Sequence, residues 1–332
     1  MELRYGKNVS IEFIIKKLNW DENRVIIKTA TKLAKHSTKK QNECYICKNK
    51  KIKKESIFYG IDYVRCLKCS HVFTKKRPTD KIMNKYYSKD KDYSHLAYAN
   101  KNELKVRQDL IRPKIRYIKK YTKGKKWLDV GSADGASIVE ICNAGFEGVG
   151  IEISESSRKF ALQYRNIELY PKPLHVFAKE GKMKWDVISF FGVLEHLPNP
   201  LEALKISHKL LSKNGIIAIA VPNYDSLSTY IQRLIHKPDR HLIPYSHSMM
   251  FTQKSLTFAF NKIGFKPISI WWWGMDVIEL LKYINKNNKN FANSKLQKTL
   301  IENLNQIQHV FDRNCLGDEF MMLGKKIIKK GN

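Results

Sequence analysis

The sequence predicts an α/β fold, with a mainly parallel sheet covered by helices on both faces and a small four-cysteine module before it. Two observations support this prediction. Strand-like and helical segments alternate from residue 127 onward, and two Cys-x-x-Cys pairs lie together upstream of them. The chain has 332 residues, of which 43% are hydrophobic, so it is long enough to bury one large core and a smaller domain.

The alternating segments define the expected sheet. A helical period over residues 104–121 ends before Gly124 and precedes the first strand. Strands are expected at residues 127–130, 148–151, 186–190, 216–221, 267–271 and 319–325. Helices are expected at residues 136–143, 156–164, 201–211, 226–235 and 253–263. This alternation is typical of a parallel sheet with helices on both faces.

The domain boundaries follow from the same segments. Residues 272–318 are too long for a hairpin turn and carry helical periodicity, so we expect an inserted helical cap there. Residues 11–18 form an amphipathic stretch near the start of the chain. The expected organisation is a leader that can contain a helix at 1–40, the cysteine module at 41–75, a connector at 76–103 and the main domain at 104–332.

The chain is strongly basic, with 61 basic and 31 acidic residues and a net charge of +30. Such a charge attracts polyanions. The lysines are nevertheless dispersed, and no arginine-rich block or alternation of aromatic and basic residues marks an RNA-binding surface. Nucleic acid is therefore a less favoured partner than a small-molecule substrate.

Membrane and secretion signals are missing from the sequence. No eighteen apolar residues run consecutively, and the start lacks a basic segment followed by an apolar one and a small-residue cleavage site. Four of the six cysteines form two pairs and the other two are isolated, a usage that fits a reducing compartment. We expect a cytoplasmic protein without a membrane span.

The segment KKWLDVGSADGASIVEIC has the form of a strand, a tight turn and a helix. Gly131 and Gly135 would let the backbone approach a ligand closely at the helix N-terminus. The next strand, GVGIEIS, places Glu152 where a carboxylate can accept both hydroxyls of a ribose. The turn alone could be structural, but together with Glu152 it predicts a nucleoside site.

The turn differs from that of a dinucleotide dehydrogenase. It lacks the fuller Gly-x-Gly-x-x-Gly pattern, and it retains Asp129 before the turn and Asp134 within it. Negative charge at these positions would repel a pyrophosphate but suits a ligand with a cationic group.

These motifs resemble those of the class I S-adenosylmethionine (SAM) dependent methyltransferases. WLDVGSADG is similar to their first motif, with Ala133 in place of the usual middle glycine, and GVGIEIS is similar to their second. WDVISFFGVLEHLPNPLEALKISHKLLSKNGIIAIAVPN is similar to their fourth strand, following helix and fifth strand. The resemblance implies a Rossmann-like seven-stranded sheet and SAM as cofactor.

The resemblance also implies a set of cofactor contacts. Gly131, Ala133 and Gly135 would lie along the methionine moiety, Glu152 would hold the ribose and Ile153 would pack on adenine. The remaining expected contacts are Phe191 and Gly192, which would form the floor, and Asp129 and Asp134, whose charge suits the SAM ammonium group. Many relatives carry an acidic residue for the adenine amine, but PKPLHVFA contains none, so that contact is unassigned.

The two cysteine pairs have the spacing of a zinc ribbon. Cys44 and Cys47 are separated by eighteen residues from Cys66 and Cys69, within the range for one tetrahedral four-cysteine site. Four thiolates leave no open position for water, so the expected zinc is structural. The lysines in this module leave nucleic-acid binding by the ribbon as an alternative.

Methyl transfer to an O–H, N–H or C–H acceptor requires a proton acceptor. His196, after the fourth strand in GVLEHLPNP, has the position and side-chain chemistry of a general base, although it could equally shape the turn. His247, in a loop with His241 and Tyr245, is a weaker candidate that could instead be structural. The run Trp271–Trp273 could form a substrate wall or pack in the core.

The sequence favours a small-molecule methyltransferase. A four-cysteine module before such a domain resembles the zinc-binding methyltransferases that act on deoxysugar nucleotides and other small metabolites, which points to a sugar or nucleotide-sugar acceptor. Two alternatives remain open: an RNA methyltransferase, and a non-enzymatic SAM-binding or scaffold protein. The residues do not indicate the accepting atom or the oligomeric state.

Overall fold

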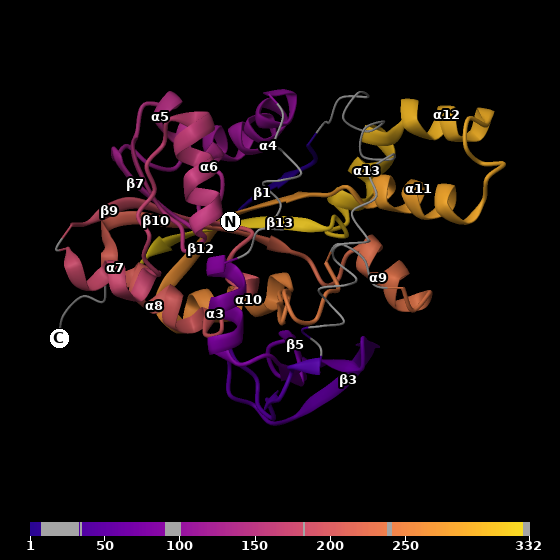
Figure 1. Cartoon of the computed structure of the whole chain (residues 1–332), viewed down its shortest axis with the longest axis horizontal. Helices are drawn as coiled ribbons and strands as arrows, with labels where there is room; N and C mark the ends of the chain where they lie inside the picture. Colours follow the sequence, from indigo (N-terminus) through magenta and orange to yellow (C-terminus); the bar gives the residue numbers. More distant parts are fainter. Residues whose placement is uncertain (8–32, 34, 90–100, 182, 238–240, 328–332) are drawn as a thin grey trace. The chain divides into compact units, whose positions relative to one another are not determined.

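The computed structural model describes residues 1–7, 33, 35–89, 101–181, 183–237 and 241–327 (Figure 1). The predicted amphipathic stretch at residues 11–18 lies outside these ranges. The chain divides into two compact units. The first unit comprises Met1–Arg77, Val221–Leu256 and Ser269–Met321, and the second comprises Pro78–Ala220, Thr257–Ile268 and Met322–Asn332.

The second unit contains most of the alternating strands and helices. Its strands are β7 (Lys126–Val130), β8 (Glu147–Ile151), β9 (Trp185–Phe191) and most of β10 (Leu211–Pro222). Its helices are α3 (Asp80–Lys89), α4 (Lys101–Lys119), α5 (Ala136–Asn143), α6 (Glu155–Arg165), α7 (Leu174–Glu180), α8 (Pro200–Leu210), most of α10 (Gln253–Ile263) and the 3₁₀ turn η2 (Leu194–His196). Figure 1 shows α5 and α6 on one face of these strands and α7 and α8 on the other.

Seven strands form one sheet in the order β1-β12-β13-β10-β9-β7-β8. The strands not yet given are β1 (Glu2–Tyr5), β12 (Phe265–Trp273) and β13 (Glu319–Lys326). The pairings of β7 with β8, β7 with β9, β9 with β10 and β1 with β12 are parallel. The predicted α/β fold with a seven-stranded sheet is confirmed.

Six of the seven strands are predicted by the sequence, and β1 is not. This strand lies in the segment expected to be a leader, and it pairs with β12 from Glu2 opposite Ser269 to Tyr5 opposite Trp272. Four residues are too few to show a hydrophobic period, so only the partner strand reveals β1.

Local signals explain where the helices of the second unit begin. Ser154 accepts a hydrogen bond from the backbone N–H of Ser157 at the start of α6, and Asn199 accepts one from Glu202 at the start of α8. The carboxyl ends of parallel strands lie at one edge of a sheet, so the residues that follow β7, β8 and β9 are brought together there. Across the described ranges, no helix combines the length and the apolar character needed to cross a membrane.

The first unit contains the cysteine module and the segment between β12 and β13. Its remaining strands are β2 (Lys39–Lys40), β3 (Ile52–Phe58), β4 (Ile61–Cys66), β5 (Val72–Thr74), β6 (Lys76–Arg77) and β11 (Met249–Met250). Its helices are α9 (Leu227–Leu234), α11 (Asp276–Asn287), α12 (Lys295–Glu302) and α13 (Leu304–Arg313). One sheet has the order β11-β5-β4-β3, and β2 pairs with β6. A strand from residues 249–250 thus extends the ribbon sheet.

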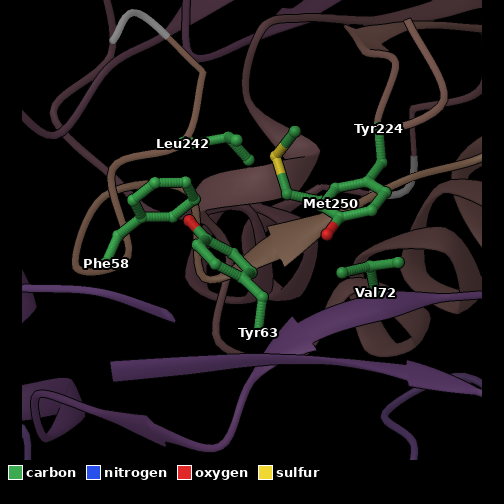
Figure 2. Close-up of a cluster of buried hydrophobic side chains, with 6 residues drawn as sticks. All are labelled: Phe58, Tyr63, Val72, Tyr224, Leu242 and Met250. Atoms are coloured by element: carbon green, nitrogen blue, oxygen red, sulfur yellow. The ribbon is translucent and has the colours of Figure 1, made fainter. Parts of the chain in front are cut away.

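The ribbon shares a hydrophobic core with the segment that follows β10. Figure 2 shows the buried side chains of this core, which are Phe58, Tyr63 and Val72 from the ribbon with Tyr224, Leu242 and Met250. Five of them, including Tyr63 and Tyr224, are fully buried, and each large side chain removed from water stabilises the fold by about 1.5–3 kcal/mol. The ribbon is therefore packed into the first unit and not only linked to it through the chain.

Buried aspartates join α9, α11, α13 and the start of β13 in the first unit. Asp276 accepts hydrogen bonds from the backbone N–H groups of Ser228, at 2.8 Å, and Asp318, at 2.9 Å. The side-chain amide of Gln308 donates to both Asp276 and Asp312, each at 2.9 Å. We refer to Asp276, Gln308, Asp312 and Asp318 as the acidic hub.

Burial in the acidic hub raises the pKa of Asp312 to about 7. Burial and the neighbouring charge of Asp318 likewise raise the pKa of Asp276 to about 8. The folded chain therefore holds protons on carboxyl groups that an unfolded chain, with an aspartate pKa near 3.9, has released at neutral pH.

Because folding raises the pKa of Asp312, its contribution to stability should fall as the pH rises from about 4 to about 7. Asn has the shape of the neutral acid and does not ionise, so Asp312→Asn should remove this loss. We expect the variant to be more stable than the parent chain by about 2 kcal/mol at pH 8 and by less at pH 5. Urea unfolding at both pH values measures the difference.

The matched control is Asp225→Asn, which changes an exposed aspartate of the same unit. This variant should show no gain in stability that grows with pH. An Asp312→Asn effect of equal size at pH 5 and pH 8 would contradict the proton-binding account.

Candidate cofactor site and metal centre

The turn between β7 and α5 has a backbone conformation that favours small residues. Gly131, Ala133 and Gly135 have φ angles of 73°, 47° and 76°. A Cβ atom on Gly131 would lie 2.6 Å from Cγ2 of Val193, so a side chain there would collide with the segment after β9. Ala133 is an L-residue in the left-handed region, which costs roughly 1–2 kcal/mol relative to glycine.

Glu152, just after β8, ties this turn to the neighbouring strand. Its Oε2 accepts a hydrogen bond from the backbone N–H of Ala133 at 3.0 Å, and its Oε1 accepts one from Ser154 at 2.7 Å. Burial raises the pKa of Glu152, while these backbone donors favour its ionised form. Each oxygen can accept a further hydrogen bond, so the carboxylate can still bind ligand hydroxyls.

Asp129 lies inside the second unit with both oxygens engaged. Ser137 and Ser189 donate their hydroxyls to Oδ2 and Oδ1, each at 2.5 Å. Burial raises the pKa of Asp129 to about 6, against the opposing effect of these hydrogen bonds. The contacts favour a role in holding β7, β9 and α5 together below the turn.

Asp134 is clamped by two arginines. Nε of Arg107, on α4, lies 2.8 Å from Oδ1, and a guanidinium N–H group of Arg165, on α6, lies 2.6 Å from Oδ2. Burial alone would raise the pKa of Asp134, but the two positive charges hold it below its usual value. These contacts favour a structural role, since they offset the negative charge that we expected to face the SAM ammonium group.

Phe191 and Gly192, which the sequence predicts as the floor of the site, lie at the end of β9. Phe191 is the last residue of β9, and Gly192 follows with a φ angle of 70° and donates its N–H to the carbonyl of Ala220. Nζ of Lys114, a largely buried residue of α4, lies 5.8 Å from the Phe191 ring centroid. Ile153, expected against adenine, is partly exposed directly after Glu152.

His196 ends the η2 turn close to two ionisable side chains. The hydroxyl of Tyr87 lies 3.1 Å from Nδ1 of His196, and Oε1 of the buried Glu195 lies 4.0 Å from Nε2. Tyr87 comes from α3, within the segment that the sequence suggested was a connector. The arrangement can orient the imidazole and pass a proton to or from it.

Sequence reasoning missed Tyr87, Lys114 and the two arginines that hold Asp134. Arg107 and Lys114 are seven residues apart, two turns of the same helix, so a closer look at the α4 sequence could have grouped them. No sequence signal links Tyr87 to His196, because the contact spans 109 positions.

His247 lies in the first unit, next to β11. Nδ1 of His247 lies 2.8 Å from the carbonyl oxygen of His241, and the two rings are nearly parallel at 5.9 Å. Nε2 of His241 lies 3.3 Å from Oδ2 of Asp318 in the acidic hub. Tyr245 is buried in the same loop.

The tryptophan run is in the core of the first unit. Trp271, Trp272 and Trp273 are at most 3% exposed. The indole N–H of Trp271 donates to the carbonyl of Gly6 at 3.0 Å, and the guanidinium of Arg4 lies 4.1 Å from its ring centroid. These contacts with β1 and the residue after it favour the core-packing alternative over a substrate wall.

The four ribbon cysteines converge on one point. The sulfur atoms of Cys44 and Cys69 are 3.5 Å apart, those of Cys47 and Cys66 are 3.4 Å apart, and all four lie within 4.8 Å of one another. A tetrahedron with zinc–sulfur bonds of 2.3 Å has sulfur–sulfur edges of about 3.8 Å. The cluster therefore has the donor set and size of a four-thiolate metal site.

Curated proteins with similar sequence include ubiquinone biosynthesis O-methyltransferases. That of Pelagibacter ubique (strain HTCC1062) is 31% identical over 134 residues, covering 39% of this chain and 55% of that protein. That of Acinetobacter baylyi (strain ATCC 33305 / BD413 / ADP1) is 27% identical over 128 residues, covering 34% and 54%. The chain thus matches about half the length of these relatives.

A solved structure of a SAM dependent methyltransferase from Archaeoglobus fulgidus is also similar, at 21% identity and a TM-score of 0.47, over 71% of this chain and 100% of that chain. A family model described as a methyltransferase domain matches residues 103–270, about half of the chain. The match includes the glycine turn, Glu152 and the end of β9. The chain therefore belongs to the methyltransferase domain family.

Proposed function

We propose that the protein is a SAM-dependent methyltransferase acting on a small molecule. The observation that carries this proposal is the carboxylate of Glu152, which is bonded to the turn after β7 and can still accept hydrogen bonds from ribose hydroxyls. When bound, SAM supplies an activated methyl group on a sulfonium centre. The protein's part is to hold the cofactor, align the acceptor and take up a proton.

The residues around Glu152 suit the other parts of SAM. The turn has a left-handed backbone at Gly131, Ala133 and Gly135, and these small residues would let the methionine chain of SAM approach the backbone. Larger side chains would cover it. Lys114 places a cation beside Phe191, at the expected cofactor floor, where it can pair with the methionine carboxylate. Ile153 would pack on adenine.

His196 is our proposed proton acceptor. The Tyr87 hydroxyl lies 3.1 Å from Nδ1, and Oε1 of Glu195 lies 4.0 Å from Nε2. The hydroxyl can fix the orientation of the ring, and the carboxylate can stabilise the imidazolium that forms. With SAM bound, its sulfonium centre would supply the methyl group to the acceptor, and the imidazole of His196 would take up the acceptor's proton. A base of this kind suits an acceptor with an O–H or N–H group.

The acceptor itself is identified only by class. The curated relatives are named for ubiquinone biosynthesis, and a sugar or nucleotide-sugar acceptor stays a prediction from the sequence. We also propose a structural zinc ion in the ribbon and, from its need for reduced thiolates, a reducing compartment such as the cytoplasm.

Replacing Glu152 tests cofactor binding. Glu152→Ala should weaken SAM binding by about tenfold to a hundredfold, because it removes the ribose acceptor and frees the Ala133 N–H from its partner. Isothermal titration with SAM measures the change. The control is Glu155→Ala, an exposed carboxylate three residues away that pairs with Lys159, and it should bind SAM like the parent chain. Equal affinities for both variants would refute the assigned ribose contact.

Replacing His196 tests the chemical step. The protein is incubated with methyl-labelled SAM and fractionated cell extract, and label should enter the small-metabolite fraction. His196→Gln should reduce this transfer by about a hundredfold or more with little change in SAM affinity, because a proton acceptor contributes about 10²–10⁴ to the rate. His175→Gln, a change in the same unit on α7, is the control.

The same experiment separates the alternatives. Label in the nucleic-acid fraction would favour an RNA methyltransferase. Binding of SAM without label in any fraction would favour a non-enzymatic SAM-binding or scaffold protein.

Metal analysis tests the ribbon. Purified protein should contain one zinc per chain, and Cys66→Ser should lose zinc and lower the thermal midpoint of the first unit, since metal binding contributes to folding. Cys142 is an exposed cysteine of α5, and Cys142→Ser should keep the zinc content and the thermal midpoint of the parent chain. A parent chain without zinc and with freely titratable ribbon thiols would rule out the metal site.

A further inference from the structure

The ribbon carries more positive charge than its own acidic residues can balance. Residues 41–75 contain eight lysines or arginines and three acidic residues. Each acid already pairs with a cation of the module, as Glu43 with Lys48, Asp62 with Lys54 and Glu55 with Arg65. The lysines that remain therefore give the surface of the ribbon a net positive charge.

Three of these lysines flank an exposed leucine at the cysteine end of the ribbon. Leu67 is 59% exposed, and Lys50, Lys51 and Lys68 are exposed as well. The backbone N–H of Leu67 donates to the carbonyl of Lys51 at 3.0 Å, so the two cysteine loops meet here. Within the part of the chain that the structure describes, no carboxylate pairs with these three ammonium groups. We refer to Lys50, Lys51, Leu67 and Lys68 as the ribbon tip.

Backbone hydrogen bonds hold the ribbon tip without using its lysine side chains. The N–H of Cys44 donates to the carbonyl of Asn49 at 2.9 Å, and the N–H of Ser70 donates to that of Cys66 at 3.0 Å. The side chain of Asn49 also accepts from the N–H of Lys51 at 3.3 Å. The lysine charges repel one another and add no described contact to the fold, so an external anion would offset them.

The composition of the ribbon favours an anionic membrane over nucleic acid as the source of that anion. Proteins bind unpaired bases by stacking them on exposed aromatic rings, and the aromatic residues at 41–75 are buried or half-buried. Exposed leucine among lysines instead suits a lipid interface. The apolar side chain can enter the acyl boundary there, while the ammonium groups stay among the phosphates.

We propose that the ribbon tip is a docking surface for a membrane that contains anionic phospholipid. Leu67 enters the interface, and the three lysines pair with lipid phosphates. Binding of this kind takes place at the surface of the bilayer and requires no membrane span. The cytoplasmic leaflet presents such lipids. The role is separate from the proposed methyl transfer and does not rest on it.

Vesicle binding by the full-length protein tests the proposal. The protein is sedimented with vesicles of phosphatidylcholine alone and with vesicles of phosphatidylcholine and phosphatidylglycerol in equal amounts. We expect binding to the mixed vesicles that weakens as salt is added, and at least about tenfold weaker binding to the neutral vesicles. Equal binding to both kinds of vesicle, or binding to neither, would overturn the proposal.

Two triple variants separate the ribbon tip from the overall net charge. The tip variant carries Lys50→Gln, Lys51→Gln and Lys68→Gln, and the control carries Lys40→Gln, Lys75→Gln and Lys76→Gln, at exposed lysines in and beside the β2–β6 pair. Both variants lose the same charge. Each lysine near an anionic surface contributes about fivefold to the affinity, so the tip variant should bind the mixed vesicles about a hundredfold more weakly. An equal loss in the control would contradict a localised docking surface.

A second pair of variants tests the leucine. Leu67→Ala should weaken binding to the mixed vesicles about tenfold, because less apolar surface leaves water. The control is Ile57→Ala in the same ribbon, since Ile57 is 47% exposed and lies towards the other end of β3, opposite Asp62. It should bind like the parent chain. Unchanged binding by Leu67→Ala would overturn the insertion of Leu67, and this pair decides the proposal even if the triple tip variant does not fold.

Titration with poly(U), a single-stranded RNA, tests the other source of phosphate. Binding to poly(U) but not to the mixed vesicles, lost in the tip variant and kept in its control, would assign the ribbon tip to nucleic acid and overturn the lipid proposal. Binding to the mixed vesicles with the expected losses, together with weak poly(U) binding that the tip variant shares, would support it.

Discussion

The hydrogen bonds accepted by Glu152 are the interaction on which the proposed cofactor site depends. They join the turn after β7 to the end of β8, so two segments that are separate in the sequence form one surface. The sequence of this turn is constrained, because there is no room for a side chain at Gly131 beside Val193. Ala133 has a strained left-handed backbone conformation, and its N–H donates to the Glu152 carboxylate.

Buried carboxyl groups have different surroundings in the two units of this basic protein. In the second unit, Asp134 pairs with Arg107 and Arg165, and Glu140 pairs with Arg112, so buried carboxylates attach α4 and α6 to the segment that carries the glycine turn. In the first unit, the acidic hub has amide and backbone donors and the His241 imidazole as described partners, and burial together with the charge of Asp318 raises the pKa of Asp276. A net charge of +30 therefore says little about either environment.

The four-cysteine ribbon is held in the first unit by more contacts than those of its cysteines. Its apolar side chains share a core with Tyr224, Leu242 and Met250, and β11 continues its sheet. Arg65 of β4 adds ion pairs with Glu55 and Asp225, and its guanidinium lies 5.2 Å from the Tyr224 ring centroid. A small module with little core of its own gains stability from such packing as well as from metal binding.

The sequence by itself determined the α/β class, six strands of the sheet, the glycine turn followed by Glu152, and the four cysteines that converge. Periodicity and short motifs record interactions between residues close in the chain. Only the tertiary structure placed β1 beside β12, Tyr87 beside His196, and Arg107 and Arg165 on Asp134. It also showed that Asp129 and Asp134 of the first motif have structural partners. These contacts join distant segments, and their geometry is set by packing, which no local pattern encodes.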